Sequence, residues 1–137
     1  MADPAALAAL HAEAFDAPWD EASIGALLAS PGVFAVAEAQ GFILVRVVAD
    51  EAEILTVAVR PPARRQGLAR RLLDQALVRA AALGAVQVFL EVAASNLPAQ
   101  GLYLQAGFEK SGLRRGYYAR LDGTSEDALV LSLKFPE

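Results

Sequence analysis

The sequence predicts an α/β domain with a mixed sheet, a class that some schemes name α+β. Apolar, strand-like segments separated by short turns precede residue 60. A long amphipathic helix follows, from Leu68 to about Leu83, because apolar side chains recur there at helical spacing. The apolar segment 86–92 then completes a strand–helix–strand unit with 54–59, and such units form right-handed parallel crossovers.

The length and composition restrict the class of protein. The chain has 137 residues, enough for one compact domain and too few for two, so residues 1–137 are expected to form a single domain. It has one histidine and no cysteine, so neither a disulfide nor a zinc–thiolate or multi-histidine site can form. The net charge of −4 argues against general nucleic-acid binding. No apolar run of 18 residues and no signal peptide occur, so we expect a soluble cytoplasmic domain.

Two short helices are expected before the sheet. Asp3 can cap a helix over 4–14, with proline in its first turn and His11 beside its apolar face as a boundary residue. Asp20 can cap a second helix, over about 21–29, which Pro31-Gly32 ends.

The remaining pattern is that of strands and one further helix. Segments 33–37 and 42–48 flank a short turn and predict a hairpin, and Asp50-Glu51 leads into 54–59, giving a three-stranded antiparallel meander. After 86–92, Ser95 or Asn96 can cap a helix over 97–106. Segments 108–113 and 128–135 predict two final strands, with the residues between them expected to form a connection.

The turn between strand 54–59 and the long helix is the first candidate site. It ends in Arg64, Gln66 and Gly67, and the first amides of the following helix have no intrahelical partners. Glycine removes the side chain that would keep a phosphate away from those amides. On pattern alone, an anion site and an ordinary strand–turn–helix connection are equally supported.

Several other side chains have two interpretations on pattern alone. Glu91, at the end of its strand, is read as a solvated or arginine-paired acid, with a general base as the alternative. Tyr103 is read as a core tyrosine rather than a catalytic acid, and Asn96 as a helix cap. Arg114-Arg115 is read as a solvated pair. Four aromatic residues lie in predicted connections and either line a site or close the ends of the sheet: Phe15, Trp19, Tyr117 and Tyr118.

The segment Arg64-Arg65-Gln66-Gly67-Leu68-Ala69 resembles the coenzyme A signature of the GNAT family of N-acetyltransferases. That signature has Gln or Arg, two free positions, Gly, one free position, then Gly or Ala. Nearly the whole chain resembles the RimI type of this family, which acetylates the N-terminal alanine of a small-subunit ribosomal protein. The segments that carry this resemblance are Phe15 to Trp19, Leu90-Glu91-Val92, Ser95-Asn96, Leu102-Tyr103, Gly107-Phe108 and Arg114 to Tyr118.

The resemblance implies a twisted, mostly antiparallel sheet of about six strands with a central parallel pair and four helices. The family's usual first strand is missing before the helix at residue 4, so an edge of the sheet is expected to be exposed or to pair with a partner chain. Acetyl-CoA is the implied co-substrate, with no metal. The implied partner is a protein N-terminal peptide, without direct nucleic-acid or membrane contact, and the chain is expected to be a monomer or weak homodimer.

The resemblance also implies roles for single residues. Glu91 would accept a proton and Tyr103 would donate one. The aromatic residues Phe15, Trp19, Tyr117 and Tyr118 would line the peptide groove, where Gly116 replaces the asparagine usual in the family. The cofactor contacts would come from Val57, Ala58, Val59, Arg64, Arg65, Gln66, Gly67, Leu68, Ala69 and Asn96. Two alternatives stay open: acetylation of a small-molecule amine or lysine side chain, and a non-catalytic coenzyme-A-binding regulatory or assembly module.

Overall fold

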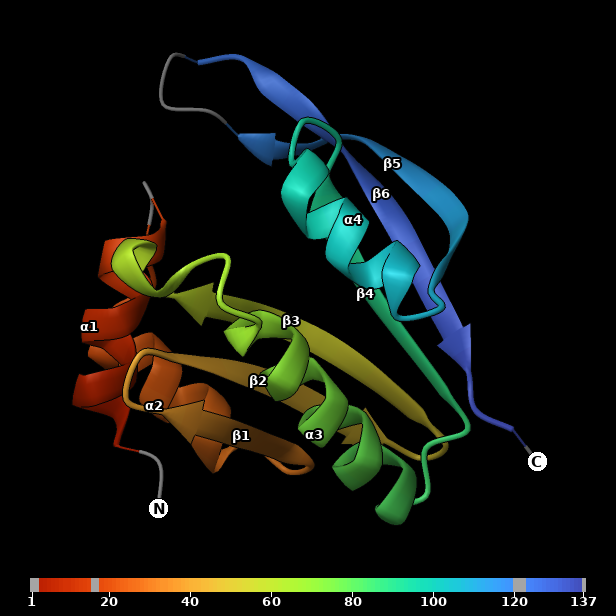
Figure 1. The fold of residues 1–137 in the computed structure, drawn as a ribbon, viewed down its shortest axis with the longest axis horizontal. Coiled ribbons are helices and arrows are strands. Elements are labelled where there is room, and N and C mark those ends of the chain that lie inside the picture. The colour runs from red at the N-terminus through yellow and green to blue at the C-terminus, as the bar shows by residue number, and fades with distance from the viewer. Residues whose placement is uncertain (1–2, 16–17, 120–122, 137) are drawn as a thin grey trace.

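The computed structural model describes residues 3–15, 18–119 and 123–136. Within these ranges the strands form one six-stranded sheet in the order β1-β2-β3-β4-β6-β5 (Figure 1). Only β3 and β4 are parallel neighbours, and every other pair is antiparallel. The predicted mixed, mostly antiparallel sheet with a central parallel pair is therefore confirmed.

The elements follow the predicted order. The helices are α1 Pro4–Ala14, α2 Glu21–Ala29, α3 Leu68–Ala82 and α4 Leu97–Gln105, with a short 3₁₀ turn, η1, over Pro61–Ala63. The strands are β1 Val33–Glu38, β2 Gly41–Val48, β3 Glu51–Val59, β4 Gln87–Ala93, β5 Glu109–Ala119 and β6 Ser125–Lys134. No helix in the described ranges is long and apolar enough to cross a membrane.

Side chains at the helix starts explain why three helices begin where the sequence predicts. The carboxylate of Asp3 accepts a hydrogen bond from the main chain of α1 at 3.0 Å, and that of Asp20 accepts one from α2 at 2.8 Å. The side-chain oxygen of Asn96 does the same for α4 at 3.2 Å. Each satisfies an amide that would otherwise lack a partner, so polar capping fixes these boundaries.

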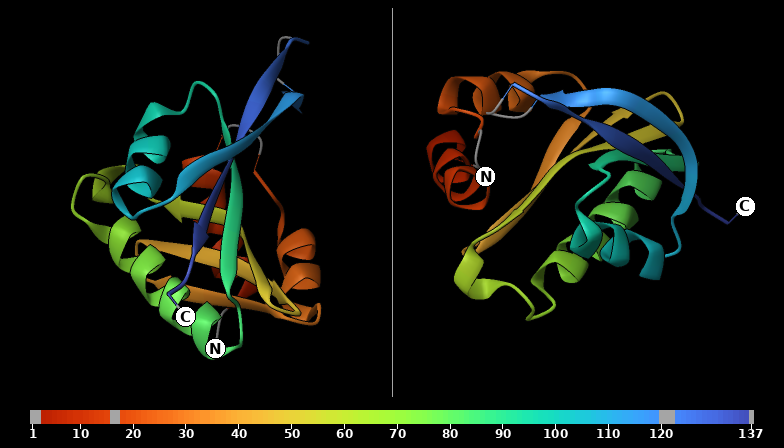
Figure 2. Two further views of the ribbon diagram at one scale, coloured as in Figure 1. Left: turned by 90° about the vertical axis from the view of Figure 1, so that its right-hand side faces the viewer. Right: turned by 90° about the horizontal axis from the view of Figure 1, so that it is seen from above.

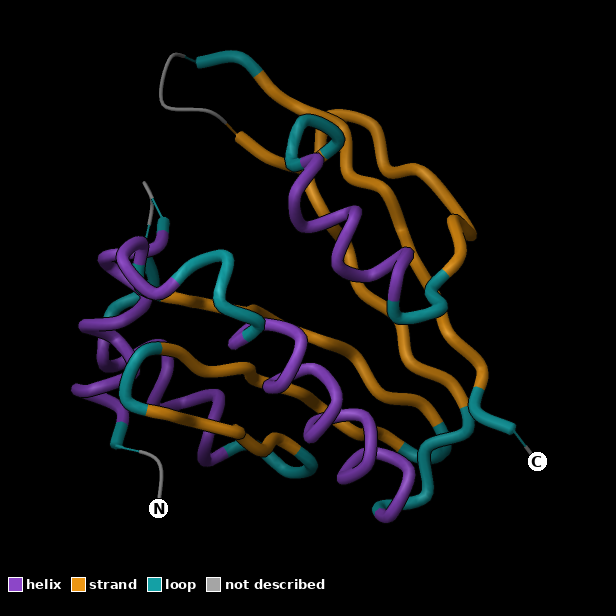
Figure 3. The backbone as a smooth tube through the Cα atoms, viewed as in Figure 1, coloured by secondary structure: helices purple, strands orange, loops and turns teal. Residues whose placement is uncertain are grey.

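The helices cover both faces of the sheet, α1 and α2 on one and α3 and α4 on the other (Figure 2). The larger core lies on the α3–α4 face, where Leu72 and Leu73 meet apolar residues of the strands, among them Leu90 and Leu131. The smaller core lies under α1 and α2 and centres on Phe42. Figure 3 shows α3 running along the β1–β3 half and α4 lying beside the β4–β6 half.

The parallel pair β3–β4 is short and opens like a fork. Pairing runs from Glu51 opposite Gln87 only to Ile54 opposite Leu90, and beyond it the strands diverge (Figure 1). The gap between the two strands beyond Ile54 and Leu90 is called the fork. The register of β3 against β2 shifts at this point, leaving Leu55 as an extra residue. Such a bulge twists a strand and is common next to functional sites. The main-chain groups of β3 after the bulge therefore lack a partner strand on the β4 side.

The structure corrects the predicted course of the last two strands. β5 continues through Arg114 and Tyr118, which were expected in a connection, and β6 begins at Ser125 rather than Ala128. Residues 120–122 of that connection lie outside the described ranges. Val86 was expected to begin the strand 86–92, but it precedes β4 and is 55% exposed.

β1 forms one edge of the sheet, as the resemblance implied. The guanidinium of Arg79 lies 4.5 Å from the centre of the Phe34 ring and donates to the main-chain oxygen of Ala35 at 3.5 Å. A charged side chain that covers an edge strand discourages pairing with another chain. Arg79 thus protects part of this edge.

Candidate functional site

The turn before α3 has the shape of an anion site. Arg65 and Gly67 both adopt left-handed backbone conformations, with φ of 63° and 78°. Gly67 precedes the first residue of α3, and no side chain caps this helix start. Successive amides in such a turn, at the positive end of a helix dipole, form a concavity that attracts anions. The anion-site interpretation therefore gains geometric support.

Arg64 braces the turn. Its main-chain amide donates to Pro61 at 3.2 Å, and its side chain donates to the main-chain oxygens of Val59 and Ala14, each at 3.3 Å. Gln66 donates from its side chain to Pro62 at 3.3 Å. Leu68 is buried in the core, so Leu68 and Ala69 offer a ligand their main-chain amides rather than their side chains. The amides for an anion thus come from residues 65–69, after the braced Arg64.

The end of β3 leads from this turn toward the fork. Arg60 donates its amide to Gln40 on the β2 side at 2.9 Å. Because successive residues direct their main-chain groups to opposite sides of a strand, Ala58 also faces β2, whereas Val57 and Val59 face the fork. Val57 and Val59 can therefore bond an extended ligand, and Ala58 instead belongs to the core under α1.

Glu91 stands on β4 just beyond the last parallel pair. Its neighbours Leu90 and Val92 point into the core on the α3–α4 face, so its side chain points to the opposite face. The side chain is 15% exposed, and Oε2 is buried without a hydrogen-bond partner among the residues the structure describes. A carboxylate oxygen in this state is available to a proton or a water molecule.

The interpretation of Arg114 and Arg115 as a solvated pair is wrong for Arg114. Its Nη1 atom lies 2.7 Å from Oε1 of Glu91, and its guanidinium lies 3.9 Å from the centre of the Tyr117 ring. The hydrogen bond to Glu91 raises the pKa of Arg114 above its ordinary value. Glu91 is thus an arginine-paired acid, one of the two readings its position allowed.

Tyr103 and Tyr118 approach the fork from different elements. Tyr103 of α4 is 6% exposed and packs edge-on against Phe108, with the ring centres 5.6 Å apart. Burial raises the pKa of Tyr103 far above the ordinary value, and the neighbouring Tyr118 adds to the shift. Burial likewise raises the pKa of Tyr118 to about 12. Both hydroxyls therefore keep their protons at neutral pH.

His11 is a member of the site that sequence reasoning missed. It is 2% exposed and stacks on both Phe15 and Trp19, with ring centres 4.3 and 4.9 Å away. Its Nδ1 accepts from the main chain of Trp19 at 3.1 Å, so in the neutral ring Nε2 carries the hydrogen and faces Thr56 Oγ1 on β3 at 3.4 Å. The four-residue spacing of His11, Phe15 and Trp19 is a signal that could have revealed this stack.

Two aromatic groups therefore flank the fork on the face that Glu91 occupies. The His11 group lies on the β3 side, under α1, and the pair Tyr117–Tyr118, with ring centres 5.0 Å apart, lies on the β5 side. Tyr103 instead belongs to the core on the opposite face. Asn96 is exposed and caps α4, as read from the pattern. Among the described residues, no three His, Cys, Asp or Glu side chains gather as metal ligands.

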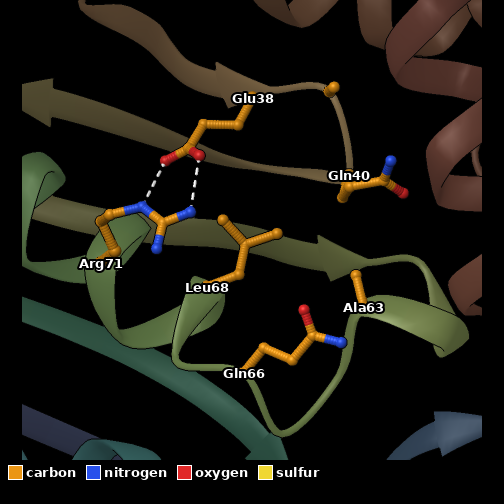
Figure 4. A pocket seen from close by; sticks show the side chains of 7 residues that line it. Glu38, Gln40, Ala63, Gln66, Leu68 and Arg71 are labelled. Atoms are coloured by element: carbon orange, nitrogen blue, oxygen red, sulfur yellow. Dashed lines mark hydrogen bonds and ion pairs between the residues drawn. The ribbon is translucent and has the colours of Figure 1, made fainter.

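A separate cavity of about 210 Å³ lies beside the turn, toward the β1–β2 hairpin (Figure 4). Arg71 of α3 forms a bidentate pair with Glu38 there, at 2.7 and 2.9 Å, and these hydrogen bonds lower the pKa of Glu38. Gln66 lines the same cavity from the turn. Neither Glu91 nor Tyr103 lines it, so it is distinct from the fork.

Comparisons with known proteins bear on the family of the chain. The model of the acetyltransferase (GNAT) family matches residues 5–108. The [ribosomal protein bS18]-alanine N-acetyltransferase of Escherichia coli K12 is 41% identical over 92 residues, which is 67% of this chain and 62% of that protein. The match thus spans less than two thirds of that relative.

One further relative and one crystal structure match over more of their length. The N-alpha-acetyltransferase RimI of Mycobacterium tuberculosis is 38% identical over 128 residues, covering 85% of this chain and 79% of that protein. The crystal structure of the E. coli ribosomal-protein-S18-alanine N-acetyltransferase superposes with a TM-score of 0.88 at 31% identity, covering 98% of this chain and 89% of that one. On the family match, the fold and these identities, the chain belongs to the GNAT family of acetyltransferases.

Proposed function

We propose that the chain is an acetyl-CoA-dependent N-acetyltransferase that acts on a protein N-terminus. The proposed acceptor is the N-terminal alanine of a small-subunit ribosomal protein. The observation that carries this proposal is the position of Glu91. Its carboxylate lies where β3 and β4 separate, on the face flanked by the two aromatic groups. The relatives named for acetylating the alanine of bS18 support the choice of acceptor.

The residues present fit acetyl-CoA. The amides of residues 65–69, at an uncapped helix start, would hold its pyrophosphate. Val57 and Val59 would bond the pantetheine arm along the unpaired side of β3, as a further strand would. Asn96, at the start of α4, would contact the donor from the other side of the fork. Acetyl-CoA supplies an acetyl group activated as a thioester, and no metal is needed to transfer that acetyl group to an amine.

Glu91 would act as the base for the incoming amine. A free N-terminal amine has a pKa of about 7.7–8.0, so a modest base suffices to remove its proton, directly or through a water molecule. The nitrogen then forms a bond to the acetyl carbon as the carbon–sulfur bond breaks. A main-chain amide near Val57 would stabilise the negative charge that develops on the carbonyl oxygen.

Tyr103 would complete the proton balance. The sulfur leaves as a thiolate, and the Tyr103 hydroxyl, kept protonated by burial, would donate a proton to it. The base and the acid then work from opposite faces of the sheet. The acceptor would enter from the face of Glu91, between the stack of His11, Phe15 and Trp19 and the pair Tyr117–Tyr118.

The test measures free-thiol release and product mass with acetyl-CoA and a panel of acceptors. The panel contains an alanine-initiated peptide, the same peptide blocked at its N-terminus but carrying an internal lysine, free lysine and a polyamine. The proposal requires the unblocked peptide to be the best acceptor and to gain 1 acetyl group. Equal turnover of the blocked peptide or the polyamine would favour the lysine or small-amine alternative. Binding of acetyl-CoA without turnover of any acceptor would favour a non-catalytic module.

A further inference from the structure

The structure assigns a positioning role to Arg114. We infer that Arg114 fixes the orientation of the Glu91 carboxylate by holding Oε1, so that Oε2 is left as the proton-accepting atom. The catalytic part of this inference rests on the proposed function, in which Glu91 is the base. The positional part concerns the free protein and can be measured without turnover.

The first support is the asymmetry of the Glu91 carboxylate. Oε1 is bound to Nη1 of Arg114 at 2.7 Å, whereas Oε2 is buried and unpartnered within the described ranges. Burying a carboxylate is costly unless a cation compensates for the lost water. Arg114 supplies this cation while occupying only one of the two oxygens. The other oxygen is therefore fixed in place and remains free to accept.

The second support is that Arg114 is itself held. Its guanidinium stacks on the ring of Tyr117, 3.9 Å from the ring centre. A cation over an aromatic face is attracted to the ring, and the planar guanidinium suits this contact better than an ammonium does. Tyr117 thus reduces the freedom of a side chain that is otherwise half exposed.

The third support is the bulge in β5 that brings these groups together. Arg114 pairs with Ala128 and Tyr118 with Glu126, so three residues of β5 lie opposite Asp127 alone. In a regular strand Arg114 and Tyr117, three residues apart, would face opposite sides. Gly116 takes a left-handed conformation in the bulge, with φ of 62°, and donates its amide to Asp127 Oδ1 at 2.9 Å. The bulge therefore lets Arg114 and Tyr117 act on the same face.

The other titratable groups around Glu91 do not supply a positive charge. Tyr117 and Tyr118 of β5 and Tyr103 of α4 are phenols, and Glu126 of β6 is a second acid that acts on Tyr118. Arg114 is the cation that pairs with Glu91 in the described part of the chain. Removing it should therefore leave the Glu91 carboxylate without its fixed partner.

The decisive experiment observes the Glu91 side chain by ¹³C NMR at one fixed pH in the free protein and measures acetyl transfer in the same variants. Glu91→Gln identifies the Glu91 resonance. In Arg114→Gln we expect the carboxyl resonance of Glu91 to move toward the position of a hydrated glutamate, and kcat to fall about tenfold or more with the KM for acetyl-CoA unchanged, because the carboxylate is no longer held in one orientation. Arg114→Lys keeps the charge but not the planar stack, so its values should lie between the two. Arg115→Gln is the matched control and should leave both values unchanged.

An unchanged Glu91 resonance and a wild-type kcat in Arg114→Gln, with the fold intact by circular dichroism, would overturn the inference. If that variant does not fold, Arg114→Lys decides, and values equal to those of the wild type have the same meaning. Full turnover by Glu91→Gln would instead remove Glu91 as base, and the NMR result would stand independently.

Discussion

The hydroxyl of Tyr118 donates a hydrogen bond to the main-chain oxygen of Glu91 at 3.1 Å, although β6 separates their strands in the sheet. Two residues of β5 therefore contact Glu91, since Arg114 pairs with its carboxylate and Tyr118 donates a hydrogen bond to its backbone. Tyr118 is also close enough to Tyr103 to affect its pKa. The hydroxyl of Tyr118 thus connects the proposed base on one face with the proposed acid on the other.

Replacing Glu91 by glutamine tests the proposed base. The amide keeps the shape of the side chain but cannot take a proton, so kcat should fall about 100-fold or more. Acetyl-CoA affinity, measured by calorimetry, should stay within about twofold, because the proposed role of Glu91 concerns the acceptor amine. Glu109→Gln, an exposed change at the far end of β5, should leave both values unchanged. Wild-type turnover in Glu91→Gln would exclude the residue from the mechanism.

Replacing Tyr103 by phenylalanine separates its hydroxyl from its packing. The ring contact with Phe108 is retained, so the thermal midpoint should change little. Turnover should fall about 100-fold if the hydroxyl protonates the departing thiolate, and stopped-flow detection of free thiol measures this step. Because burial raises the pKa of Tyr103, the wild-type enzyme should show no loss of this proton donor up to about pH 9. A wild-type rate in Tyr103→Phe would return Tyr103 to a purely structural role.

Replacing Gly67 by alanine tests the anion site. A non-glycine residue in the left-handed conformation costs about 1–2 kcal/mol, and the methyl group meets no protein atom within 4 Å. The protein should therefore fold, while the dissociation constant for acetyl-CoA rises about tenfold or more because the methyl group would face the pyrophosphate in the proposed site.

Gly101→Ala is the matched control for this change. Gly101 lies inside α4, where an added methyl group also meets no atom within 4 Å. Alanine is a better helix former, so this variant should gain about 1 kcal/mol in unfolding free energy and bind acetyl-CoA normally. Unchanged binding in Gly67→Ala would mean that the phosphates lie elsewhere.

The buried His11 predicts a pH dependence of stability. Burial lowers its pKa from 6.5, so the unfolded chain binds the proton more readily than the folded one. The stability that the neutral ring contributes is fully present above about pH 6.5 and is lost as the pH falls through the lowered pKa of the folded state. Protonation would also break the bond from the Trp19 amide to Nδ1.

Urea unfolding of the wild type and His11→Gln from pH 8 to pH 5 measures this effect. The variant should be less stable at pH 8, because the stack with Phe15 and Trp19 is lost. The difference between the two proteins should shrink as the pH falls. A difference that stays constant over this range would show that protonation of His11 does not affect the free energy of unfolding.

Local signals in the sequence predicted most of the fold. Capping residues such as Asp3 and Asp20 act over a few positions, and so they fixed the helix starts. The extension of β5 was missed because Gly112 and Gly116, with two arginines between them, interrupt its apolar pattern. That strand is held by pairing with β6 and by the bond to Asp127 rather than by its own composition.

The site required contacts between distant residues. Arg114 and Glu91 are 23 positions apart, and His11 and Thr56 are 45 apart. The local spacing of residues in the sequence does not indicate that these side chains meet. The roles of Glu91 and Tyr103 came from family resemblance, and the structure adds the surroundings in which those roles can be tested.

The short parallel contact between β3 and β4 has a consequence for hydrogen exchange. The two halves of the sheet, β1–β3 and β4–β6, are paired with each other over four residue pairs of β3 and β4. A donor molecule bonded along Val57 and Val59 would lengthen this contact. The amides of Val57 and Val59 should then exchange with solvent quickly in the free protein and slowly once the donor is bound, so the substrate would supply hydrogen bonds that β3 lacks on this side.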